Sequence, residues 1–228
     1  MKRRWIFLLA AVFSVSLVMS GCDAAERKTE AEEPANITSE QMTEAEDFEE
    51  LGKIYSQTMA LDKALGKDTP YTRVYLCLET GKMIGHTEED SFQTAKEFIT
   101  LTRAIEWYAE KNGISVSEKE VDDYMKECFA EVEKADVYVK YDQALRKYGF
   151  TFKEYYFQFP ELYRWQYIVQ GLLHEDGKEA DTDRIVQAYK ETGEYDSLLQ
   201  LLIRCREACG EWGNDVEKLQ DAEIYYGR

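Results

Sequence analysis

The stretch from Phe150 to Tyr167 limits the fold more than any other part of the chain, because half of its residues are Phe, Tyr or Trp. Thr151 is followed three positions later by Glu154, the spacing of a capping box that begins a helix. Apolar side chains then cover most of the circumference of this helix, so other helices must enclose it or a partner must cover it. Pro160 removes one backbone hydrogen bond and predicts a kink or a break.

The rest of the chain also favours helices, since it has only three prolines and long stretches without glycine. Apolar periodicity with start and stop signals predicts helices over about 44–65, 91–111, 117–132, 137–148, 181–192 and 194–209. Residues 71–86 are ambiguous, because β-branched and aromatic residues surround a turn-like Glu-Thr-Gly-Lys sequence. We expect an all-α fold, an irregular multi-helix bundle, with a small hairpin or an irregular crossover as options for 71–86.

The first residues have the pattern of a secretory signal. Three basic residues precede an uncharged apolar run from Trp5 to Val18, which is shorter than the ~20 residues of a membrane-spanning helix. The Ser-Gly-Cys sequence that ends at Cys22 resembles the lipobox of bacterial lipoproteins, whose cysteine is diacylated. We expect residues 1–21 to be a lipoprotein signal peptide and Cys22 to carry lipid. Ordinary cleavage after Gly21 is the alternative.

The segment after the signal is acidic. Residues 22–47 contain no aromatic side chain and cannot bury enough apolar surface to offset the entropy of ordering, so a disordered tether is expected. Residues 48–228 are long enough for a single domain with a sizeable core. The net charge of −17 argues against nucleic acid as a partner. The same negative charge argues against electrostatic binding to a membrane surface, so membrane contact is expected through the lipid on Cys22.

Cysteine and histidine give little sign of a reactive site. Export permits disulfides, and the sequence leaves open whether the four thiols of the domain pair: Cys77, Cys128, Cys205 and Cys209. His86 and His174 have no partner at the spacing of a zinc site. Nucleotide-binding glycine patterns and motifs for a nucleophilic serine or cysteine are missing as well. We expect no metal, no cofactor and no enzymatic activity.

A longer pattern, from Phe98 to Glu127, resembles the N-terminal chaperone domain of SurA-type and PrsA-type foldases. In that family an apolar helix ends in Ala and is followed by a Gly-Ile turn, a Val-Ser pair and a Glu-Val pair. Here these elements are Ala109, Gly113-Ile114, Val116-Ser117 and Glu120-Val121. The sequence from Ala144 to Phe159 fits the next part of the family pattern, with Leu145, Gly149 and Glu154 in place. The resemblance covers about residues 91–173.

The resemblance implies a membrane-anchored, extracytoplasmic domain that binds unfolded or extended segments of exported proteins in the bacterial cell envelope. PrsA-type foldases are lipoproteins, which agrees with the lipobox. Those foldases usually continue into a parvulin-type prolyl isomerase domain, and the roughly fifty residues after Leu173 leave no room for one. We therefore expect non-catalytic, chaperone-like binding. The alternative is a structural or adaptor lipoprotein whose domain docks a dedicated partner or forms a homo-oligomer.

The aromatic stretch supplies the candidate client-binding residues, which are Tyr155, Phe157, Tyr163 and Trp165. On a continuous helix, Phe157 and Trp165 would point within about 80° of each other and are the pair expected to remain accessible. The side chains expected to face the core are Phe152, Tyr156, Phe159 and Tyr163. The sequence leaves open how the stretch divides between core and binding surface.

Overall fold

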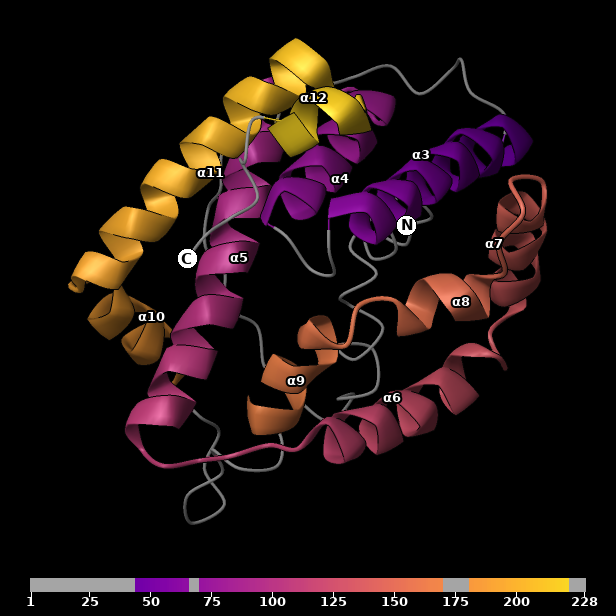
Figure 1. The fold of residues 1–228 in the computed structure, drawn as a ribbon. Coiled ribbons are helices and arrows are strands. Elements are labelled where there is room, and N and C mark those ends of the chain that lie inside the picture. The colour runs from indigo at the N-terminus through magenta and orange to yellow at the C-terminus, as the bar shows by residue number, and fades with distance from the viewer. Residues whose placement is uncertain (1–43, 66–69, 170–180, 222–228) are drawn as a thin grey trace, which may run out of the picture.

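The computed structural model describes residues 44–65, 70–169 and 181–221. Every regular element in these ranges is helical, which confirms the all-α fold class. In chain order the helices are α3 (Glu44–Leu65), α4 (Pro70–Met83), α5 (Glu88–Lys111), α6 (Glu118–Val132), α7 (Asp136–Arg146), α8 (Phe152–Phe157), α9 (Glu161–Tyr167), α10 (Thr182–Lys190), α11 (Gly193–Trp212) and α12 (Val216–Asp221) (Figure 1). Cys22 and the expected signal peptide lie outside the described residues.

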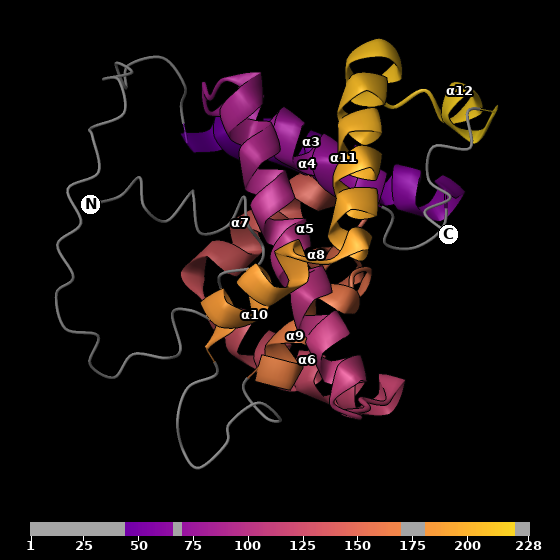
Figure 2. The same cartoon turned by 90° about the vertical axis from the view of Figure 1, so that its left-hand side faces the viewer.

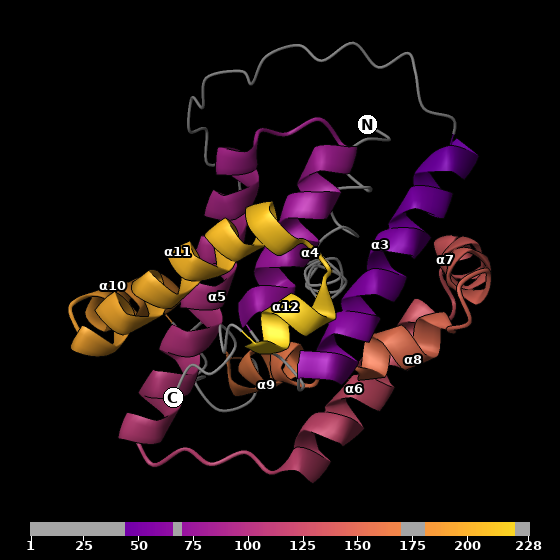
Figure 3. The ribbon, with the colours of Figure 1, turned by 45° about the horizontal axis from the view of Figure 1, so that its top comes forward.

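Helix α4 lies at the centre of the bundle. It packs against α3, α5 and α11, and Figure 3 shows it between α3 on one side and α5 with α11 on the other. Its side chains are correspondingly enclosed, since Tyr71, Val74 and Leu76 are at most 2% exposed. Burial on several sides explains why this segment has no clear amphipathic periodicity in the sequence.

Most of the segment 71–86 belongs to α4, so neither the small hairpin nor the irregular crossover that the sequence left open is present there. The Thr80 hydroxyl donates to the Leu76 carbonyl oxygen at 2.6 Å, so the polar group of this β-branched residue has a hydrogen-bond partner within the helix. Gly81 is helical rather than part of a turn. A Cβ atom at Gly81 would lie 1.9 Å from Ser91 Oγ, so the glycine permits the close approach of α5. Tertiary burial therefore outweighs the strand preference of the sequence.

The core has two parts that meet at α3 and α4. One part joins these helices to α5, α10, α11 and α12, and it includes Phe92, Ile105 and Leu202. Figure 2 shows α10 and α11 lying over α5 on this side. The other part joins α3 to α6, α7 and α8, and it includes Tyr55 and Met125. The aromatic stretch contributes to both parts, which gives it a different environment at each end.

The aromatic stretch forms two short helices. At the start of α8, the Glu154 backbone N–H donates to Thr151 Oγ1 at 3.1 Å and the Thr151 N–H donates to Glu154 Oε2 at 2.7 Å, which confirms the capping box. Helix α8 ends at Phe157, and Pro160 occupies the residue before α9. A proline is tolerated at the start of a helix, where its missing N–H is not needed. A kink or a break was predicted at Pro160, and the structure has a break.

Local signals placed two further helix ends and missed the start of α5. The predicted capping box at Ser117 and Glu120 is present at the start of α6. Gly113 follows Asn112, the C-cap residue of α5, and adopts a positive φ of 68°, as predicted for a helix stop. Helix α5 begins at Glu88 instead of residue 91, because the Thr87 side chain accepts a hydrogen bond from the backbone of the first turn.

Candidate functional site

A crevice of about 480 Å³ lies between the C-terminal half of α3 and helix α8. This volume falls in the range of ~300–1,000 Å³ that is usual for ligand pockets. The residues that line it are Met59, Asp62 and Lys63 from α3, and Phe150, Glu154, Phe157 and Gln158 from α8 and its flanks. Apolar side chains thus form much of the wall, and charged or amide groups lie among them.

The position of the α8 wall is fixed by aromatic packing and one polar contact. Tyr155 stacks on Tyr55 of α3, with 4.2 Å between ring centroids and 5° between ring planes. The Phe152 backbone N–H donates to Asp142 Oδ1 of α7 at 3.0 Å. These contacts hold α8 against α3 and α7 together, so the crevice has a rigid wall in place before any partner binds.

Phe157 is the one sequence-predicted candidate that lines the crevice. Its ring centroid lies 5.4 Å from that of Phe129 and 5.4 Å from that of Tyr156. The side chain is partly buried. Phe157 therefore packs on the core while it also contributes apolar surface to the crevice.

The two exposed charges of the crevice stand on opposite walls: Lys63 on α3 and Glu154 on α8. Hydrogen bonds from the Thr151 side chain and backbone hold the pKa of the Glu154 carboxyl below its ordinary value. Asp62 also lines the crevice, but unlike Lys63 and Glu154 it is only 1% exposed. Burial raises the pKa of Tyr155; the charge of Arg73 acts to lower this pKa, and the charge of Asp62 acts to raise it.

Two of the predicted client-binding residues belong to the core in this structure. Tyr155 is 1% exposed and Tyr163 is 4% exposed, so neither presents a surface to a client. Tyr155 is covered by Tyr55, and the Tyr163 ring lies 4.8 Å from that of Tyr156. This corrects their assignment as contact residues. The four side chains that were expected to face the core do so, and they are Phe152, Tyr156, Phe159 and Tyr163.

Phe157 and Trp165 do not form a shared surface, contrary to the prediction. Phe157 packs in the part of the core around α6, α7 and α8. Trp165 packs in the other part, where its ring meets Phe98 of α5 edge-to-face at 6.4 Å. Both side chains are partly buried. The break at Pro160 gives α8 and α9 different directions, so the angular spacing of a continuous helix does not apply.

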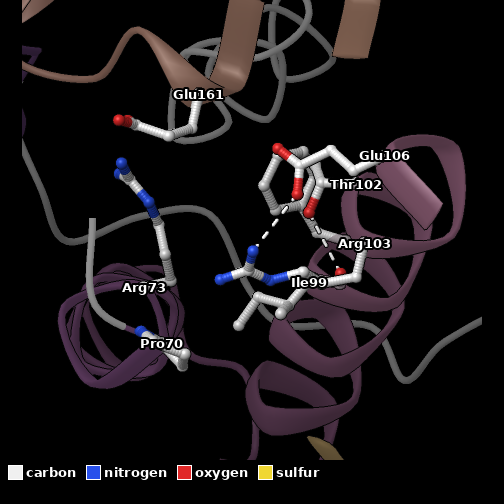
Figure 4. Close-up of a pocket in the computed structure, with 8 residues that line it drawn as sticks. Pro70, Arg73, Ile99, Thr102, Arg103, Glu106 and Glu161 are labelled. Carbon is white, nitrogen blue, oxygen red and sulfur yellow. Dashed lines mark hydrogen bonds and ion pairs between the residues drawn. The ribbon is translucent and has the colours of Figure 1, made fainter. Parts of the chain in front are cut away.

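A second, much smaller hollow lies beside Arg73 (Figure 4). Its volume is about 20 Å³, room for roughly one water molecule. Figure 4 shows the Arg73 guanidinium directed toward the Glu161 carboxylate, and the guanidinium carbon lies 4.0 Å from the Phe159 ring centroid. On the opposite wall, Arg103 forms an ion pair with Glu106 at 3.1 Å. The contact between Arg73 and Phe159 connects α4 to the turn between α8 and α9. The hollow itself is too small for a ligand.

The four thiols in the described part of the chain are unpaired. Burial raises the pKa of Cys205 and of Cys209 to about 12 and that of Cys77 to about 11, which keeps these thiols protonated near neutral pH. Within the described ranges, no three His, Cys, Asp or Glu side chains are grouped as metal ligands. None of the helices described in the structure is long and apolar enough to cross a membrane.

Most of the crevice was not foreseen from the sequence. Among its lining residues only Phe157 was a candidate, and the α3 wall comes from a segment far earlier in the chain. No local pattern joins Lys63 to Glu154, because their proximity depends on how α8 docks. Comparisons of the chain with protein-family models, with curated proteins and with solved structures found no match.

Proposed function

We propose that this protein is a membrane-anchored extracytoplasmic lipoprotein that binds exposed apolar segments of unfolded or extended exported polypeptides without catalysis. The observation that carries the proposal is the crevice between α3 and α8, with Met59, Phe150 and Phe157 in its walls. Anchoring depends on the signal pattern that ends at Cys22. The resemblance of about residues 91–173 to foldase chaperone domains agrees with the same role.

The chemistry of the crevice suits a partner of variable sequence. Met59 is 7% exposed, so it contributes only a small part of its flexible, polarizable side chain to the wall. Phe150 and Phe157 offer ring surface, and Gln158 offers an amide that can donate to or accept from a peptide backbone. The apolar part of the wall can contact varied apolar groups and does not require one sequence.

A dedicated protein partner or a homo-oligomer has less support. Such an interface normally needs a contiguous exposed apolar patch. Among the described residues, the large hydrophobic side chains classed as exposed are Val139 at 55% and Ile203 at 39%. These two residues lie on α7 and α11, which are on different sides of the bundle (Figure 1). They do not form one patch.

The test compares how well variants of the purified full chain suppress aggregation of a chemically unfolded, reduced client such as lysozyme. Phe157→Ala removes apolar surface from the crevice, and Gln158→Trp fills the crevice without deleting a core contact. We expect both variants to suppress aggregation several-fold less well than the wild type. Ile203→Ala is the matched control, because it removes exposed apolar surface from α11.

Urea unfolding of each variant separates lost binding from lost folding. The proposal requires that Gln158→Trp keep a wild-type unfolding midpoint and lose activity. Full suppression by Gln158→Trp, or an equal loss in Ile203→Ala, would show that the crevice is not the binding site and would overturn the proposal.

A further inference from the structure

The α8 wall of the crevice places a fixed negative charge beside an aromatic ring. Glu154 and Phe157 are three residues apart in α8, so their side chains are neighbours on one helix face. The Thr151 backbone N–H and hydroxyl donate to Glu154 Oε2 at 2.7 and 2.8 Å. Both bonds end on the same oxygen, so Oε1 can accept from a donor outside the helix. The carboxylate is therefore oriented and still available.

The α3 wall carries the opposite charge. Lys63 is exposed and lines the same crevice. A positive group of a bound segment is attracted to Glu154 and repelled by Lys63, so it will lie against α8. Asp62 also lines the crevice, but it is 1% exposed, so a bound cation can contact the exposed Glu154 carboxylate more readily than the Asp62 carboxylate.

The whole chain adds to the same preference. Its net charge of −17 creates a field that attracts cationic polypeptides and repels acidic ones. Lysine and arginine also carry apolar stems that can lie on a ring while the charged head reaches a carboxylate. The pair of Phe157 and Glu154 matches both parts of such a side chain.

We infer that the crevice selects polypeptide segments in which a lysine or arginine adjoins an apolar side chain. The apolar side chain packs against Met59, Phe150 and Phe157, and the cation pairs with Glu154 on the α8 wall. This inference rests on the proposed function and specifies the class of client segment that the site prefers.

Three fluorescein-labelled peptides test the inference with the purified full chain. All share a central Phe-Leu pair in a Gly/Ser frame and carry flanking Lys, Gln or Glu residues. Fluorescence anisotropy should give the affinity order Lys, then Gln, then Glu. The Lys peptide should bind about three- to tenfold more tightly than the Gln peptide at low salt, as one exposed ion pair and the overall field allow. High salt should reduce this ratio.

Two charge variants assign the preference to the crevice. Glu154→Gln removes the charge while keeping an acceptor for the capping box, so the Lys-to-Gln affinity ratio should fall to near one. Glu207→Gln makes the same change in net charge at an exposed position on α11 and should keep most of the ratio. Lys63→Gln should raise the ratio.

The outcomes separate the inference from the proposed function. Equal affinity for the three peptides would overturn the inference and leave the proposed function standing. No binding of any peptide would overturn the proposed function together with the inference. An equal drop of the ratio in Glu207→Gln and Glu154→Gln would show that the overall field sets the preference, and it would overturn the role of Glu154.

Discussion

Tyr155 lies flat against Tyr55, with their ring centroids 4.2 Å apart and their planes within 5° of parallel. The stack joins α8 to α3, the two helices that form the crevice. The same contact removes Tyr155 from any surface that a client could reach. A side chain expected to bind clients thus holds in place the wall that we propose binds them.

The Tyr55–Tyr155 stack should be measurable as a coupling energy. Each single change to Ala should destabilise the fold, and the double variant should lose less than the sum of the two. A coupling of about 0.5–1.5 kcal/mol is expected beyond simple burial. Chemical unfolding of the four proteins of the cycle provides the measurement. Strict additivity would mean that the two rings contribute independently and that the stack does not hold α8.

Core and surface positions should differ sharply in their effect on stability. Phe159 is 1% exposed, so Phe159→Ala should lower the free energy of unfolding by on the order of 3–5 kcal/mol. Val139 is 55% exposed, and Val139→Ala should change it by no more than about 0.5 kcal/mol. Urea unfolding followed by circular dichroism checks both values. Similar, small effects at the two positions would contradict the assignment of Phe159 to the core.

The effect of Gly81→Ala on the free energy of unfolding should depend on the residue at position 91 and can change sign. In the wild type, Gly81→Ala places a Cβ atom 1.9 Å from Ser91 Oγ and 2.7 Å from Ser91 Cβ, so the fold should lose about 1–3 kcal/mol. In a Ser91→Gly background the obstruction is gone. There Gly81→Ala should be neutral or should stabilise the helix by up to about 1 kcal/mol.

Ser91→Ala is the control for this pair. It keeps the Cβ atom at the 2.7 Å contact, so it should relieve Gly81→Ala only in part. Thermal unfolding of the six proteins tests the set. Equal destabilisation by Gly81→Ala in all three backgrounds would show that the close approach of α4 and α5 is not the cause.

Stability should fall in alkaline solution. Burial raises the pKa of Cys205 to about 12 and also raises the pKa of Tyr55. In the unfolded chain a thiol ionises near pH 8.5 and a tyrosine near pH 10. The unfolded state therefore loses protons first, so this stability is complete below about pH 8 and declines as the pH rises toward the folded pKa values.

Urea unfolding at about pH 8 and about pH 10.5 measures this decline through the linkage between protonation and stability. Cys205→Ala removes one of the groups and should make the decline shallower. A free energy of unfolding that stays constant over this range would contradict the raised pKa values.

Cys22 should determine where the protein is found. If the cysteine carries lipid, the wild type will fractionate with the membrane and take up labelled fatty acid. Cys22→Ser should release the protein from the membrane fraction or leave the signal uncleaved. A wild-type protein that is recovered from the medium with an unmodified Cys22 would show that the lipoprotein assignment is wrong.

The sequence by itself determined the features that depend on neighbouring residues. The capping boxes at Ser117 and Thr151, the stop at Gly113 and the break at Pro160 were all predicted and are present. Each involves hydrogen bonds or backbone angles within a few positions, so local chemistry is sufficient. The all-α class follows from the same signals and from the apolar periodicity of the longer helices.

Only the tertiary structure decided the conformation of residues 71–86 and the location of the side chains of the aromatic stretch. Helix α4 forms because it is buried between α3, α5 and α11, and Gly81 serves a contact with Ser91 that no local pattern reveals. The break at Pro160 sends Phe157 and Trp165 into different parts of the core. The crevice joins α3 to α8 across a long stretch of sequence. These features result from burial and docking between helices that are distant in the sequence. The energies of those contacts depend on residues far apart in the chain, so a local segment does not determine them.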